Sequence, residues 1–150
     1  MFDLAKVPGN TRLFLGSSLL TSDSWLAYQV PQGAVALSIL CVGGGGAGGA
    51  GFTGAAASAR GGGGGGGSGG VTRLLISTMF LPGVLYIMPG RGAIGIAGSP
   101  SRVGVAPNTN SQNMLVYAAN GGIGGTGTAS AGGPAGTAAA VASAANCGPF

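Results

Sequence analysis

The sequence contains no histidine and no glutamate, and its acidic residues are Asp3 and Asp23 alone. An acid–base pair, a Ser-His-Asp triad or a carboxylate-rich metal site needs side chains that this chain does not have. There is no Gly-Lys-Ser/Thr string for a phosphate loop, and Gly-x-Gly strings are expected by chance among 35 glycines. We therefore predict that the protein is not an enzyme and that it holds no cofactor and no metal ion.

Charge and long hydrophobic runs are also scarce. Charged residues make up 5% of the 150 residues, and the six Lys and Arg side chains are scattered, which argues against a nucleic-acid surface. No apolar run approaches the roughly 18 residues of a membrane-spanning helix. The first residues, Met-Phe-Asp-Leu-Ala-Lys, lack the features of a secretory signal. We expect synthesis in the cytosol, no membrane insertion and no binding to nucleic acid.

The two cysteines, Cys41 and Cys147, lie far apart and match no metal-binding or redox spacing. We expect both to be free thiols, with Cys41 in the hydrophobic core. A disulfide between them is the alternative.

Glycine is abundant instead, and its blocks separate aliphatic segments. Runs such as residues 43–51 and 61–70 have no side chains with which to form a helix face or a strand face. They are either flexible linkers or polyproline II rods whose N–H and C=O groups pair with neighbouring rods. For residues 43–54, 92–104 and 121–136 we favour packed rods and not flexible linkers, because these blocks interrupt hydrophobic strands and lack charge.

Small residues recur at every third position within these blocks, as close packing of three-per-turn rods requires. One small column contains residues 45, 48, 51 and 54, a second contains residues 92, 95, 98, 101 and 104, and a third runs in steps of three from residue 121 to residue 148. We expect Gly95→Val and Gly124→Val to push neighbouring rods apart.

Short alternating segments bounded by Pro and Gly predict β-strands, and no helical periodicity occurs. The predicted strands are residues 25–30, 34–42, 71–80, 84–88 and 114–119. Cys41 shares a period-two face with Val35, Leu37 and Ile39, so we expect these four side chains to be buried together. The Pro-Gly turn at residues 82–83 suggests an antiparallel meander of its two flanking strands. The predicted fold is all-β: a small, jelly-roll-like antiparallel β-sandwich with glycine-rich insertions that form a polyglycine II bundle.

We divide the chain into an N-terminal arm, residues 1–20, and a glycine-rich β-sandwich, residues 21–150. The arm carries apolar side chains without a closed pattern, and the predicted core is small. We therefore expect the arm to dock on a partner subunit through Phe2, Leu13, Phe14 and Leu15. Because the chain is 45% apolar, we also expect a homo-oligomer, with a trimer favoured.

The order of elements resembles the glycine-rich domains of bacteriophage tail fibre and tail-tip proteins. The resemblance rests on Trp25, the Val-Pro-Gln-Gly string at residues 30–33, the strand that follows and the glycine run from Gly43. It continues through Pro89-Gly90 and residues 115–122 and covers about residues 25–136. It implies a β-sandwich with a polyglycine II bundle, located in the virion and contributing to host attachment. This chain has a short arm where a full fibre would have a shaft, which favours a small appendage or tip subunit.

Two other functions stay open on the sequence alone. One is a capsid decoration protein of the same fold, and the other is an ice-binding polyglycine protein. For the attachment function, loop residues Phe52, Arg60 and Asn108 are candidate contacts to a host glycan or surface protein, because they can stack on a sugar, pair with acidic groups and bind hydroxyls.

Overall fold

The computed structural model describes residues 11–16, 24–54, 60–92 and 94–139. These residues contain β-strands and two 3₁₀ turns, and no α-helix occurs among them. In chain order the elements are β1 (Leu26–Gln29), β2 (Ala36–Val42), β3 (Val71–Ser77), η2 (Thr78–Phe80), β4 (Val84–Met88), β5 (Ser101–Gly104), η3 (Ser111–Asn113) and β6 (Met114–Ala118).

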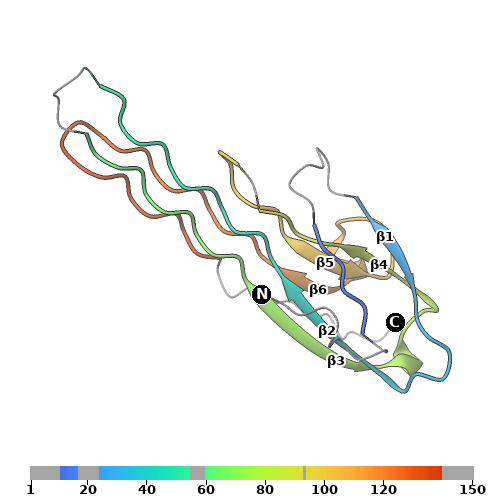
Figure 1. The fold of residues 1–150 in the computed structure, drawn as a ribbon. Helices are drawn as coiled ribbons and strands as arrows, with labels where there is room; N and C mark the ends of the chain where they lie inside the picture. The colour runs from blue at the N-terminus through green and yellow to red at the C-terminus, as the bar shows by residue number, and fades with distance from the viewer. Residues whose placement is uncertain (1–10, 17–23, 55–59, 93, 140–150) are drawn as a thin grey trace.

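The strands form two antiparallel sheets, as Figure 1 shows. The larger sheet has the strand order β1-β4-β5-β6, and the smaller one is the two-stranded ribbon β2-β3. The ribbon pairs without interruption from Ala36 opposite Ser77 to Val42 opposite Val71. The predicted all-β class with antiparallel sheets is confirmed.

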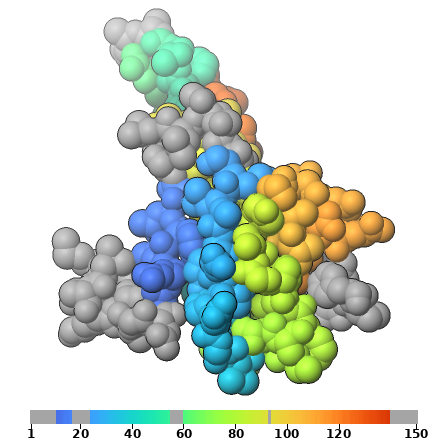
Figure 2. All heavy atoms as spheres, turned by 90° about the vertical axis from the view of Figure 1, so that its right-hand side faces the viewer, coloured from blue at the N-terminus to red at the C-terminus, as the bar shows by residue number. Residues whose placement is uncertain are grey.

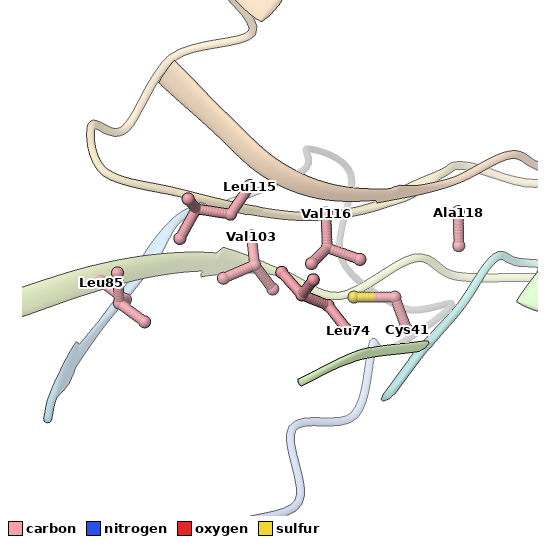
Figure 3. Close-up of a cluster of buried hydrophobic side chains, with 7 residues drawn as sticks. All are labelled: Cys41, Leu74, Leu85, Val103, Leu115, Val116 and Ala118. Carbon is pink, nitrogen blue, oxygen red and sulfur yellow. The ribbon is translucent and has the colours of Figure 1, made fainter. Parts of the chain in front are cut away.

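The core lies between the ribbon and the larger sheet (Figure 3). Its buried cluster consists of Cys41 and Leu74 from the ribbon and Leu85, Val103, Leu115, Val116 and Ala118 from the larger sheet. Leu37 and Ile39 pack against this cluster and are partly buried, as the period-two face predicts. The expected burial of Val35 is wrong, because this side chain is 81% exposed. Val35 precedes Ala36, the first paired residue of β2, and so lies beyond the end of the ribbon.

Three details of the strand prediction need correction. The predicted strand 71–80 ends at Ser77 and continues as η2, whose turn is closed by a hydrogen bond from the Leu81 N–H to the Thr78 carbonyl. The expected meander around Pro82-Gly83 is wrong, because β3 pairs with β2 while β4 pairs with β1 and β5. β5 was not expected, since its four residues fall inside a segment predicted to be a glycine rod.

Four extended glycine-rich segments project from one end of the sandwich (Figure 1). We call them rod 1 (residues 43–54), rod 2 (residues 60–70), rod 3 (residues 119–128) and rod 4 (residues 131–139), and together the glycine bundle. Rod 1 continues from β2, rod 2 leads into β3, and rods 3 and 4 follow β6. Figure 2 shows the same narrow projection above the broader sandwich.

Backbone hydrogen bonds join the rods at every third residue. The N–H groups of residues 43, 46, 49 and 52 in rod 1 donate to carbonyls 70, 67, 64 and 61 in rod 2. Rod 2 donates in turn from residues 61, 64, 67 and 70 to carbonyls 128, 125, 122 and 119 in rod 3. Rod 3 donates to rod 1 from residues 121, 124 and 127, and to rod 4 from residues 122, 125 and 128. Rod 4 donates to rod 2 from residues 133, 136 and 139.

The predicted rod at residues 92–104 is not one of the four rods of the glycine bundle. Its last four residues are β5, and Gly95 has a φ of 75°, in the left-handed region that favours glycine. The segment instead contacts the base of the bundle. The Gly44 N–H donates to the Ser99 carbonyl, the Ala47 N–H donates to the Ile96 carbonyl, and the Gly98 N–H donates to the Gly121 carbonyl.

Candidate functional site

The glycine bundle depends on the absence of side chains at defined positions, and rod 2 shows this most clearly. A Cβ atom on Gly64 would lie 1.9 Å from the Pro134 carbonyl oxygen in rod 4, and one on Gly63 would lie 1.9 Å from the Gly49 oxygen in rod 1. A Cβ atom on the next residue, Gly65, would meet nothing within 4 Å. Two of the three columns of rod 2 therefore require glycine, while the third faces open space.

Rod 3 also has columns in which a Cβ atom would clash, and its sequence places glycine there. A Cβ atom on Gly121 or Gly124 would lie 2.0 or 2.1 Å from a carbonyl oxygen of rod 2. The third column of this rod carries the exposed side chains Ile123 and Thr126. The small column predicted from residue 121 onward is therefore a column of close approach in rod 3.

The column predicted for rod 1 is the wrong one. A Cβ atom on Gly45 or Gly48 would make an ordinary contact at 3.5 Å. The column that excludes a side chain along the rod contains Gly43, Gly46 and Gly49, where a Cβ atom would lie 1.9 to 2.0 Å from carbonyl oxygens of the chain that follows β6. At the base of the rod Gly44 also excludes one, because a Cβ atom there would lie 1.8 Å from the Arg91 carbonyl oxygen. Gly95 also differs from the expectation, because a Cβ there meets nothing within 4 Å. Its positive φ, and not the spacing of rods, is what a substitution would disturb.

Two of the three predicted contact residues meet at the far end of the bundle. The Phe52 N–H donates to the Gly61 carbonyl at 2.9 Å, and the Arg60 Nη2 donates to the Gly54 carbonyl at 3.1 Å. Phe52 is partly exposed and Arg60 is exposed. Residues 43–52 of rod 1 separate this tip from the end of β2 at Val42. Phe52 and Arg60 therefore form an aromatic and cationic tip.

Asn108 lies elsewhere, in the loop between β5 and β6. Its side-chain oxygen accepts hydrogen bonds from the Asn110 N–H at 3.1 Å and from the Asn113 Nδ2 at 3.2 Å. Asn110 in turn caps η3 by accepting from the Gln112 N–H. These bonds give Asn108 a structural function within its own loop. The structure does not bring it together with Phe52 and Arg60.

The arm is described over residues 11–16, and Phe2 lies outside the described residues. Phe14 packs edge-on against Tyr28 of β1, with ring centroids 5.7 Å apart. Leu13 and Leu15 are exposed. Phe14 therefore packs on its own domain, whereas Leu13 and Leu15 stay available to a partner.

Reactive side chains are few in the part of the chain that the structure describes. Cys41 is a free, buried cysteine, and burial raises the pKa of its thiol from 9.0 to about 11. Cys147 lies outside the described residues. The cationic side chains there are all arginines, and Asp3 and Asp23 both fall in ranges that are not described. Arg102 lies over the ring of Tyr117 at 5.6 Å, a cation–π contact between neighbouring strands.

Two further properties bear on the kind of site. Among the described residues, no group of three or more His, Cys, Asp or Glu side chains could hold a metal ion. The same residues contain no helix that is long and apolar enough to cross a bilayer.

The sequence profile of the glycine-rich domain family matches residues 21–149. The chain belongs to this family, and the match covers the sandwich and all four rods. No curated protein and no solved structure matches the chain.

Sequence reasoning missed two features of this surface. It did not identify which column of rod 1 excludes side chains, since the three columns of an isolated rod are equivalent until its neighbours are placed. It also did not identify the apolar outer face of the ribbon. Leu40, Val42, Val71 and Leu75 lie on the face opposite the core, and all four are exposed. Their alternation with the core residues was the available signal.

Proposed function

We propose that this protein is a structural component of a bacteriophage virion, a tail-fibre, tail-tip or appendage subunit that contributes to host attachment and catalyses no reaction. In this proposal the rods are polyglycine II helices, and the bundle is a stiff spacer that holds its tip away from the particle. The observation that carries the proposal is the three-residue hydrogen-bond period along four rods, which ends at Phe52 and Arg60.

The bundle suits this function because its cohesion does not depend on side chains. The rods bond to one another through backbone groups, and the columns that exclude a side chain contain glycine. Residues at the tip and on the open columns can therefore change without disturbing the rods. Such a scaffold separates a variable binding surface from a constant support.

The tip favours a carbohydrate or an anionic surface as its ligand. An aromatic ring stacks on the apolar face of a sugar, and a guanidinium group pairs with a carboxylate or a phosphate. Each contact would be weak, so attachment would rely on several copies of the subunit acting together. Oligomerisation through Leu13 and Leu15 of the arm, or through another surface, would supply that multivalency.

The location of the protein in a purified particle tests the proposal. Gold-labelled antibody against the chain should mark the tail or its appendages in electron micrographs of the phage that encodes it. Label on the capsid shell would support the decoration function instead, and the absence of label from particles would refute the proposal.

A panel of immobilised bacterial polysaccharides, neutral and uronate-containing, tests whether the tip binds them. Phe52→Ser combined with Arg60→Ser should abolish retention, while Asn108→Ser should not change it.

A further inference from the structure

The outer face of the larger sheet carries a cationic side chain between a thioether and an aromatic ring. Met88 on β4 lies opposite Arg102 on β5, and Arg102 lies opposite Tyr117 on β6. Residues opposite each other in a sheet share a face, so these three side chains form one row across three strands. Val103, the next residue of β5, belongs to the core, so the row lies on the face away from the core. Tyr86, two residues before Met88 on β4, lies on the same face.

Arg102 is partly buried in this row without an acceptor for its charge. Its guanidinium group lies 5.6 Å from the centre of the Tyr117 ring, and its Nε atom is buried and has no hydrogen-bond partner among the described residues. The same residues contain no Asp and no Glu. Folded proteins rarely leave a buried polar atom without a partner, and a partly buried cation loses hydration that an anion replaces. Within the described part of the chain, the Arg102 cation therefore lacks a counter-charge.

We propose that Arg102 and Tyr117 form a binding site for an oxyanion, either the carboxylate of an acidic sugar or a phosphate group. A guanidinium group presents its N–H donors in a planar fork that matches two oxygens of such a group. The contact with the Tyr117 ring holds this fork in place, so a ligand does not have to order it. Because the group is partly removed from water, its hydrogen bonds to an anion are stronger than those of a fully solvated arginine. The site lies on the sandwich and is therefore separate from the tip of the bundle.

Anion binding must be separated from a purely structural function of the Arg102 side chain. Met88 opposite it is 2% exposed, and the stem of an arginine can cover apolar surface. Arg102→Met keeps a long unbranched stem and removes the charge, so this variant should fold and lose only the anion site. Arg73 on the outer face of the ribbon provides the matched control. It is exposed and lies opposite Leu40 instead of an aromatic side chain, so nothing holds its fork in place in the same way.

NMR titration of the ¹⁵N-labelled full chain at constant ionic strength tests this inference. The reporters are the Arg102 Nε–H signal and the backbone amides of Arg102 and Tyr117. Glucuronate and inorganic phosphate should shift these signals in a saturable way with a Kd on the order of 1 mM, whereas glucose, which has no charge, should not shift them. Arg102→Met, followed through the backbone amides, should weaken binding by about tenfold or more. Arg73→Met should leave the Kd unchanged.

The comparison between the two anions identifies the source of the oxyanion. Tighter binding of glucuronate assigns the site to an acidic sugar, tighter binding of phosphate assigns it to a phosphate group, and either result supports the proposal. The absence of a saturable shift at about 50 mM of both anions would overturn it, as would wild-type binding by Arg102→Met or an equal loss in Arg73→Met.

A variant of the tip keeps this test distinct from the attachment function proposed above. Phe52→Ser combined with Arg60→Ser should leave the shifts at Arg102 and Tyr117 unchanged, because the anion site contains neither residue. Loss of these shifts in the tip variant would overturn the assignment to Arg102. Since the titration uses the isolated chain, its outcome does not depend on where the protein is located in a particle.

Discussion

Two neighbouring glycines in rod 2 should respond in opposite ways to the same substitution. In Gly64→Ala the new Cβ atom would lie 1.9 Å from the Pro134 oxygen, whereas real Cβ atoms essentially never come within 3.0 Å of a heavy atom outside their own residue and its two chain neighbours. Rod 4 must therefore move away by about 1.1 Å. In Gly65→Ala the new methyl group meets nothing within 4 Å. The two variants have the same composition and differ by one position.

The cost follows from the bonds that hold rod 4. The Gly125 N–H donates to the Pro134 carbonyl at 2.7 Å, the Gly133 N–H to Gly62 at 2.8 Å, and the Gly136 N–H to Gly65 at 2.7 Å. A shift of about 1.1 Å lengthens such bonds beyond the usual limit of about 3.2 Å. At about 0.5–1.5 kcal/mol for each of the three, Gly64→Ala should lower the free energy of unfolding by about 1.5–4.5 kcal/mol.

Gly65→Ala should instead be neutral or stabilising by up to about 1 kcal/mol, because alanine restricts the unfolded chain. Thermal and urea unfolding of both variants, followed by circular dichroism, measure the difference. Amide exchange of rod 4 residues shows whether the loss is local to the bundle. If Gly64→Ala and Gly65→Ala have equal stability, the rods are not held at the spacing described here and the reasoning is refuted.

Three other predictions concern the sandwich. Cys41 has a folded-state pKa of about 11 against 9.0 when exposed, so the folded chain binds more protons between these values and stability should fall by about 2–3 kcal/mol from pH 9 to pH 11. Cys41→Ala should lack this part of the decline in urea titrations. Leu115→Ala empties a site that is 1% exposed and should cost about 2–5 kcal/mol in the same assay, and a cost below 1 kcal/mol would contradict the core assignment. Phe14→Ala removes the contact with Tyr28 and should cost about 1–2 kcal/mol, whereas Leu15→Ala should stay within about 0.5 kcal/mol.

The strands could be predicted where the pattern and its boundaries agree. β4 spans the residues expected for it, because a short run of apolar residues is bounded by Pro-Gly on both sides. β5 was missed because Ser101 and Gly104 also continue a column of small residues, and four residues are too few to show a period of two. The pairing of β3 with β2 and of β4 with β1 and β5 depends on which sheet completes the core. That choice is a tertiary one and leaves no local signal.

The glycine segments at residues 43–54 and 121–136 could be recognised as candidates for packed rods, but the segment at residues 92–104 was wrongly grouped with them, and the register of the rods could not be predicted. Three-per-turn spacing allows three small columns in rod 1, and residues 45, 48 and 51 are as small as residues 43, 46 and 49. Only the positions of rods 2 and 3 decide which column faces a neighbouring carbonyl. The tip pair of Phe52 and Arg60 was named from residue type alone, and its juxtaposition follows from the hydrogen bonds that join rods 1 and 2.

Residue-resolved amide hydrogen exchange of rod 2 tests most directly whether backbone bonding holds the bundle together. The N–H groups of Gly61, Gly64, Gly67 and Gly70 donate to rod 3, while those of Gly62, Gly63, Gly65 and Gly66 form no backbone hydrogen bond among the described residues. Protection should therefore recur at every third residue of an otherwise uniform glycine run. Fast exchange at all of these residues, without that period, would show that the glycine segments are flexible linkers.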